Sequence, residues 1–165
     1  MQNQELAHRI VQDHDKLDRT FTDLERTFTD LKDDNFDRRQ DHELLEDARA
    51  DLNFALEEML EHFGVEEEAI FQHLRQALPD LSERLDGLEE GHEALCSRVT
   101  QLRKMVAAAE AGLKTFDPAA ALESLQQMRR ILSLHNNAEV QIFLEALERL
   151  DGDDQRILRE NLEQL

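Results

Sequence analysis

The chain of 165 residues contains no tryptophan, no tyrosine, two prolines, five glycines and one cysteine. Lacking tyrosine and tryptophan, it has no residue for tyrosyl-radical chemistry and few side chains that stack on nucleic-acid bases. A single cysteine, Cys96, excludes a disulfide framework and any multi-cysteine zinc or iron–sulfur site. The scarcity of proline, glycine and β-branched residues beside abundant Leu, Ala, Glu, Gln and Arg favours helix throughout.

Positive charge is also scarce, with 19 Lys and Arg against 38 Asp and Glu and a net charge of −19. Such a surface repels phosphate backbones and anionic bilayers, so we expect neither nucleic acid nor a membrane as a partner. No apolar run approaches the roughly 20 residues of a spanning helix, and residues 1–10 lack a secretory signal pattern. We therefore expect a cytoplasmic protein whose apolar residues, 40% of the chain, form a folded core.

Apolar residues recur at spacings of three and four in four segments, the pattern of amphipathic helices. These segments cover residues 6–31, 45–70, 81–113 and 121–146. Pro79 is expected to end the second helix, Asp41 to cap its start, and Asp117 to cap the fourth helix ahead of Pro118. The pattern predicts an all-α fold, an antiparallel up-down-up-down four-helix bundle over residues 1–150. A short amphipathic helix at 151–165 is expected to pack on one end of it.

Six positions in the apolar seams carry a polar side chain. They are His14, His62, Glu66, His92, His135 and Glu139. One buried histidine is more often a hydrogen-bonded core residue, but counting from the turns at about 1.5 Å per residue brings all six to a similar level. In each His-x-x-x-Glu motif, the imidazole and the carboxylate share one helical face. Because buried charges are usually paired or metal-bound, these residues predict a metal site inside the bundle.

Four imidazoles and two carboxylates form a nitrogen and oxygen ligand set that suits two first-row metal ions. Two carboxylates can bridge a pair of ions held a few ångströms apart. Iron is favoured over zinc, because structural zinc sites close with four ligands and usually use thiolates. Manganese accepts the same ligand types and stays an alternative.

The order H … HxxxE … H … HxxxE resembles the hemerythrin-like, or HHE cation-binding, family. The resemblance is carried by DHDKL at residues 13–17, HFGVEEEAIF at 62–71, EEGHEAL at 89–95 and HNNAEVQIFL at 135–144. It implies a non-haem di-iron centre with Glu66 and Glu139 as bridging carboxylates beside an oxo or hydroxo bridge. It also implies that O₂, NO or peroxide binds at an open iron position.

One position departs from the oxygen-carrying members of that family, which have a second histidine one turn after the third-helix histidine. This chain has Cys96 there, so it resembles the subgroup that lacks this ligand. The missing imidazole favours exchangeable ligands or redox reactivity over simple O₂ carriage. Cys96 itself is most simply interpreted as a small buried apolar residue, with a thiolate ligand or redox-sensing thiol as the alternative.

Other polar residues are expected to stay outside the ligand set. They are His8, His42, His73, Asp18, Glu67 and Glu68, the last two being solvated or supporting the ligands. Ligating histidines usually donate their second N–H to a carboxylate or carbonyl group, and Glu61 and Glu89 are the candidates for that role. Three aromatic residues are expected to border the site and keep it dry, namely Phe63, Phe71 and Phe143.

Two other functions fit parts of the pattern. A ferritin-like di-iron oxidase, peroxidase or iron-handling protein would carry Glu-x-x-His on two helices; Glu89 and His92 match, but Leu132 stands three residues before His135. A metal-free helical interaction module would have to bury two carboxylates without a cation. The pattern favours a di-iron protein that binds, senses or reacts with O₂, NO or peroxide.

Overall fold

A computed structural model describes residues 2–33, 38–112 and 115–165 of the chain. The prediction of an all-helical protein is confirmed, and no strand occurs among these residues. The helices are α1 (Gln2–Asp33), α2 (Arg38–Val65), α3 (Gln72–Ala77), α4 (Ser82–Glu110), α5 (Pro118–Arg149) and α6 (Gly152–Leu162). None of the helices in the described ranges is long and apolar enough to cross a membrane.

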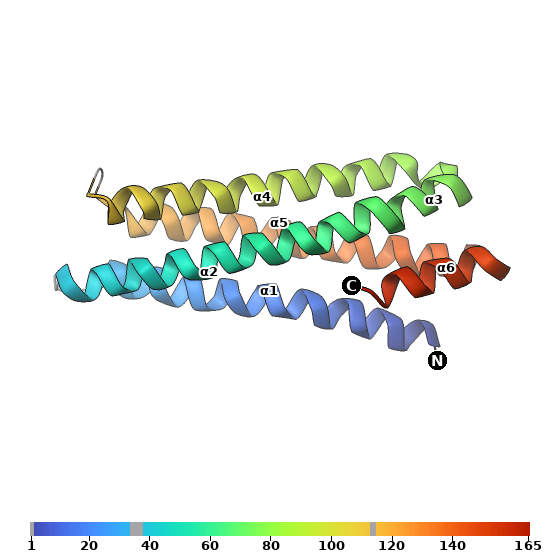
Figure 1. Cartoon of the computed structure of the whole chain (residues 1–165), viewed down its shortest axis with the longest axis horizontal. Helices are drawn as coiled ribbons and strands as arrows, with labels where there is room; N and C mark the ends of the chain where they lie inside the picture. The colour runs from blue at the N-terminus through green and yellow to red at the C-terminus, as the bar shows by residue number, and fades with distance from the viewer. Residues whose placement is uncertain (1, 34–37, 113–114) are drawn as a thin grey trace.

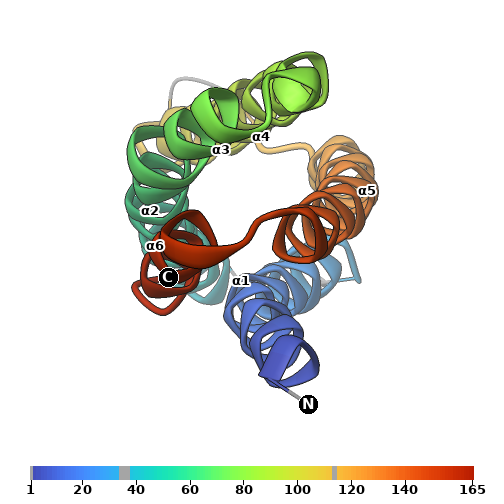
Figure 2. The same ribbon diagram turned by 90° about the vertical axis from the view of Figure 1, so that its right-hand side faces the viewer.

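The four long helices α1, α2, α4 and α5 lie side by side, and each runs opposite to the one before it (Figure 1). Helix α1 packs against α2 and α5, and α4 packs against the same two helices. Viewed end-on, the four surround a common interior (Figure 2). Each helix therefore turns its apolar seam toward the others, as amphipathic helices in a bundle do.

The apolar core consists of two clusters at different levels along the bundle. One contains buried residues such as Phe21, Leu52 and Leu102, and the other contains buried residues such as Phe71 and Leu85. Five of the six polar seam positions lie between the residues that the two clusters take from the same helical stretch, and His62 directly precedes Phe63, the last residue that the first cluster takes from α2. Apolar layers on both sides therefore hold the polar layer and limit its contact with water.

Two predicted helix boundaries are confirmed and one is wrong. The second helical stretch ends at Ala77, ahead of a 3₁₀ turn that begins at Pro79, and the Asp117 side chain accepts a hydrogen bond from Ala120 N at 3.1 Å. Asp41 is not an N-cap, because α2 begins at Arg38 and Asp41 lies in its first turn. The residues Arg38, Arg39 and Gln40 favour helix, so α2 begins before Asp41. The predicted seam position Leu113 and residues 34–37 of the predicted break lie outside the described residues, and so does the side chain of the predicted seam position Leu6.

A π-helical segment, Glu66–Phe71, interrupts the second helical stretch between α2 and α3. The three-and-four spacing predicted an uninterrupted α-helix here, which is wrong. A π turn contains one residue more than an α turn, so it changes which side chains face the core. The consecutive residues Ile70 and Phe71 are both fully buried as a result.

Helix α6 turns back after Leu150 and packs on the π-helical segment, α1, α3 and α5 (Figure 1). The turn is tied by Gln155, whose Nε2 donates to the carbonyl oxygens of Leu147 at 2.7 Å and Leu150 at 3.2 Å. Gly152 in this turn has φ +52°, a conformation that strains residues with a Cβ. Leu158 fixes the helix by burying its side chain in the core.

Candidate metal centre

The six polar seam residues converge at one place inside the bundle. His14 comes from α1, His62 from α2, Glu66 from the π-helical segment, His92 from α4, and His135 and Glu139 from α5. They form two sets of four residues, and both carboxylates belong to both sets. In each set, every residue offers one ligand atom, and these four atoms lie within 4.8 Å of one another. We call these the His14–His62 group (His14, His62, Glu66 and Glu139) and the His92–His135 group (Glu66, His92, His135 and Glu139).

The two oxygens of each carboxylate face different groups. Oε1 of Glu66 lies 2.8 Å from His62 Nε2, and Oε2 of Glu66 lies 3.0 Å from His92 Nε2. Likewise, Oε1 of Glu139 lies 3.3 Å from His14 Nε2, and its Oε2 lies 3.2 Å from His135 Nε2. Both carboxylates therefore span the two groups, with one oxygen in each.

The donor atoms fit a pair of cations. Both oxygens of Glu66 and of Glu139 are buried and have no hydrogen-bond partner among the described residues, and the same holds for Nε2 of His14, His92 and His135. The close contacts between them thus lack hydrogen-bond geometry. Ligands about 2.1 Å from one metal ion lie roughly 3 to 4.2 Å from each other, which matches the spacing within each group. The residues present therefore suit two ions bridged by both carboxylates.

The two buried carboxylates differ in the direction of their pKa shifts. The pKa of Glu66 is raised well above its usual range, first by burial and then by the negative charge of Glu139. Burial also acts to raise the pKa of Glu139, but its contacts with His135 and His14 outweigh this and lower it. Without a cation the centre favours a proton on Glu66 beside an ionised Glu139, and a bound cation would replace that proton.

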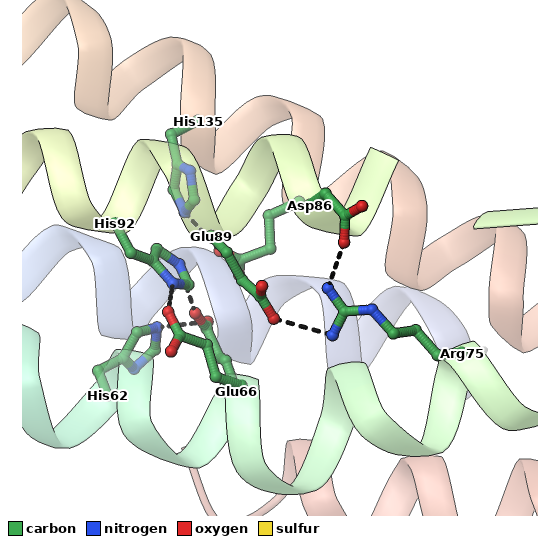
Figure 3. A network of polar contacts seen from close by, with 9 residues as sticks. His62, Glu66, Arg75, Asp86, Glu89, His92 and His135 are labelled. Atoms are coloured by element: carbon green, nitrogen blue, oxygen red, sulfur yellow. Dashed lines mark hydrogen bonds and ion pairs between the residues drawn. The ribbon is translucent and has the colours of Figure 1, made fainter. Parts of the chain in front are cut away.

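His92 is held by two stacked aromatic rings and by a hydrogen bond at one nitrogen. Phe63 stacks on its ring at 3.8 Å between centroids with an interplanar angle of 9°, and Phe71 stacks at 5.7 Å and 13°. Nδ1 of His92 lies 2.7 Å from Oε1 of Glu67. Nε2 of His92 faces Glu66 (Figure 3). The expectation that Phe63 and Phe71 border the site is confirmed. Phe143 packs behind Phe71, with ring centroids 6.2 Å apart.

The carboxylate that holds His92 is Glu67, which was expected to be either solvated or supporting the ligands, and not Glu61 or Glu89. Glu89 instead accepts from Arg75 Nη1 at 2.8 Å, and the same guanidinium binds Asp86 at 2.7 Å (Figure 3). Glu61 is exposed and lines a pocket beside His62. Only the tertiary structure selects Glu67, because it places Oε1 of Glu67 2.7 Å from Nδ1 of His92 on α4.

Gly91 makes room for His135. A Cβ at Gly91 would lie 2.8 Å from Nδ1 of His135, closer than carbon and nitrogen approach each other without a bond. An apolar groove of about 440 Å³ between α4 and α5 borders both residues. A glycine inside a helix is unfavourable by about 1 kcal/mol relative to alanine, and this was the one sequence signal that could have identified Gly91.

The His14–His62 group is the more exposed side of the centre. The side chains of His14 and His62 are 9% and 13% exposed, whereas those of His92 and His135 are 3% exposed. A pocket of about 170 Å³ lies against His14 and His62 and is closed in part by Leu165. A second, of about 310 Å³, reaches His14 between α1 and α5.

Cys96 belongs to neither group. Its side chain is half-buried and packs against the apolar core, and burial, followed by the charge of Glu67, raises the pKa of the thiol. A raised pKa keeps sulfur protonated and weakly reactive, which agrees with the interpretation of Cys96 as a small apolar residue.

The remaining polar candidates lie away from the centre. His8, His42 and Glu68 are exposed. A ring nitrogen of His73 lies 3.1 Å from the carbonyl oxygen of Asp154 in α6. Asp18 accepts a hydrogen bond from Arg129 Nη2 at 2.9 Å.

The family model described as the hemerythrin HHE cation binding domain matches residues 5–147. This match includes all six converging residues. Neither the curated proteins nor the solved structures compared with the chain gave a significant match.

Proposed function

Because the chain belongs to the hemerythrin HHE cation-binding domain family, we propose that it is a non-haem di-iron protein. Its centre binds, senses or reacts with O₂, NO or peroxide. The proposed scaffold is an antiparallel up-down-up-down four-helix bundle over residues 1–150, with residues 151–165 packed on one end. The proposed ligands are His14, His62, Glu66, His92, His135 and Glu139, around two iron ions with an oxo or hydroxo bridge.

One observation carries this proposal. Glu66 and Glu139 each direct one oxygen to the His14–His62 group and the other to the His92–His135 group. A single cation would leave half of these buried oxygens without a partner, which is costly in an apolar surrounding. Two cations satisfy all four oxygens and neutralise both carboxylates, and the nitrogen and oxygen donors suit iron.

The centre holds each ion with two imidazoles and two shared carboxylates. Iron bound in this way supplies redox electrons and coordination positions that a small molecule can occupy. The pockets beside His14 provide an approach for such a molecule, while Phe63 and Phe71 exclude water from His92. Cys96 takes the place of the second histidine of the oxygen-carrying members and is not part of the His92–His135 group. This group therefore contains two imidazoles.

The test is the metal content and spectrum of the purified protein reconstituted with ferrous iron. We expect close to two iron atoms per chain and near-ultraviolet absorption bands of the oxidised form that change with azide. Glu66→Ala and Glu139→Ala should each lose most of the metal, and Glu68→Ala should keep it. A protein that is fully folded at neutral pH and takes up no metal would overturn the proposal.

Turnover distinguishes binding or sensing from catalysis. Adding peroxide to the reduced protein should give a single stoichiometric oxidation if the protein binds or senses, and many turnovers if it is a peroxidase. The ferritin-like alternative is less well supported, because Glu89 of its Glu-x-x-His motif is engaged by Arg75 and not by the centre.

A further inference from the structure

Both nitrogens of one imidazole are engaged by consecutive residues of another helix. Glu66 and Glu67 both reach His92 on α4: Oε2 of Glu66 lies 3.0 Å from Nε2, and Oε1 of Glu67 lies 2.7 Å from Nδ1. The contact at Nδ1 is a hydrogen bond, whereas the contact at Nε2 lacks hydrogen-bond geometry. Because an ionised carboxylate can only accept, Glu67 places the proton of a neutral His92 ring on Nδ1. Nε2 is then unprotonated and presents its lone pair to the shared carboxylates.

We propose that Glu67 is a positioning residue for the metal ion in the His92–His135 group, acting through His92. This inference rests on the proposed function, since it requires a metal ion in that group. Glu67 selects the tautomer of His92 that can donate through Nε2 and makes the imidazole more basic by accepting its Nδ1 proton. It therefore strengthens metal binding without touching the metal.

The surroundings of His92 leave this task to the carboxylate. Phe63 and Phe71 stack on the ring and fix its plane, but stacking does not determine which nitrogen carries the proton. A ring turned over, or protonated on Nε2, would fit between the same two phenyl groups while presenting no lone pair at that position. The hydrogen bond to Glu67 disfavours these alternatives, so the metal ion binds more tightly.

The alternative is that Glu67 only links the π-helical segment to α4. Its side chain is 39% exposed, so a link of this kind contributes little to the stability of the fold. Metal affinity separates the two roles, because carboxylates that orient a ligating histidine typically change affinity by about 10–100-fold. The spectrum separates them further, since His92 belongs to one group only.

The experiment compares Glu67→Ala and Glu67→Gln with Glu68→Gln in the full chain, loaded with ferrous iron alone. Each variant removes one negative charge from the same segment, and Glu68 is exposed. The rate of iron loss to a chelator and the Mössbauer spectrum of each loaded protein are measured, together with the thermal stability of each metal-free protein.

We expect Glu67→Ala to lose iron about 10–100-fold faster than wild type and to change the Mössbauer signal of only one of the two iron environments. The rate of iron loss from Glu67→Gln should lie between the rates of wild type and Glu67→Ala, because the glutamine amide oxygen still accepts from Nδ1 but carries no charge. Glu68→Gln should match wild type, and all metal-free proteins should unfold at similar temperatures.

The possible failures are distinct. Wild-type protein that binds no iron would overturn the proposed function and this inference with it. Wild-type protein with two iron ions, and a Glu67→Ala variant with the same loss rate and spectrum, would overturn this inference alone. Equal effects of Glu67→Ala and Glu68→Gln would also overturn it, because they would show a general effect of charge.

Discussion

Replacing Gly91 with alanine should weaken metal binding strongly while changing the stability of the metal-free fold only a little. The new Cβ would stand 2.8 Å from Nδ1 of His135, and the ordinary contact distance is about 3.4 Å or more. The imidazole must therefore move by about 0.6 Å, away from α4. Metal–ligand distances tolerate changes of only about 0.2 Å, so Nε2 of His135 can no longer reach the position that it shares with Glu139.

The effect on the metal-free protein should be much smaller. Alanine is favoured over glycine inside a helix by about 0.5–1 kcal/mol, and crowding in a packed interior opposes this by about 1–3 kcal/mol. The groove beside Gly91 and His135 gives the displaced ring room to move outward, which keeps the crowding at the low end. We expect unfolding free energy within about 2 kcal/mol of wild type, together with metal affinity at least about tenfold weaker.

Gly87 is the matched control, because it lies one turn earlier in α4 and a Cβ there would meet nothing within 4 Å. Gly87→Ala should raise the unfolding free energy by about 0.5–1 kcal/mol and leave metal binding unchanged. Urea unfolding with a chelator present gives the stabilities, and metal competition with the chelator gives the affinities. If Gly91→Ala binds two metal ions as tightly as Gly87→Ala does, the assignment of His135 as a ligand is wrong.

Three further predictions concern stability. Because burial raises the pKa of Glu66 in the folded state, metal-free protein should lose stability as pH rises from the ordinary pKa of 4.5 toward the raised value. Melting temperatures across this range in chelator should show the loss in wild type and not in Glu66→Gln, and restoring the metal should remove it. Asp117→Ala should lower the unfolding free energy by about 1 kcal/mol, since it removes the acceptor for Ala120 N. Asp117→Asn should keep most of the wild-type unfolding free energy, and urea unfolding measures both variants. Phe63→Ala should destabilise metal-free protein by about 3–5 kcal/mol, against less than about 0.5 kcal/mol for the exposed Phe54→Ala; equal effects would contradict the packing described.

The helical fold could be predicted from the sequence because its signals are local. Apolar spacing identified the long helices, Pro79 ended one stretch and Asp117 began another. Asp41 failed as a cap because α2 begins earlier, at Arg38, and the arginine and glutamine residues before Asp41 favour helix. The π-helical segment carries no comparable signal, since nothing local in EEEAIF separates a π turn from an α turn.

The six converging residues could also be predicted, because each interrupts an apolar seam and helical phase alone turns it inward. Counting residues from the turns was enough to bring them to one level, since rise per residue is nearly constant in helices. The partner of His92 was not predictable in this way. Glu61, Glu67 and Glu89 all lie near the seams, and choosing among them depends on how far a long side chain reaches toward the next helix.

The sequence by itself determined which residues face the interior of this protein and that six of them are polar, because helical periodicity depends only on position along the chain. Tertiary structure alone decided that Glu66 and Glu139 each direct one oxygen to the His14–His62 group and the other to the His92–His135 group. It also decided that Glu67 holds His92 and that Gly91 gives His135 its space. These arrangements depend on distances of 3 Å between different helices, and such distances follow from packing and not from the order of residues in any one helix.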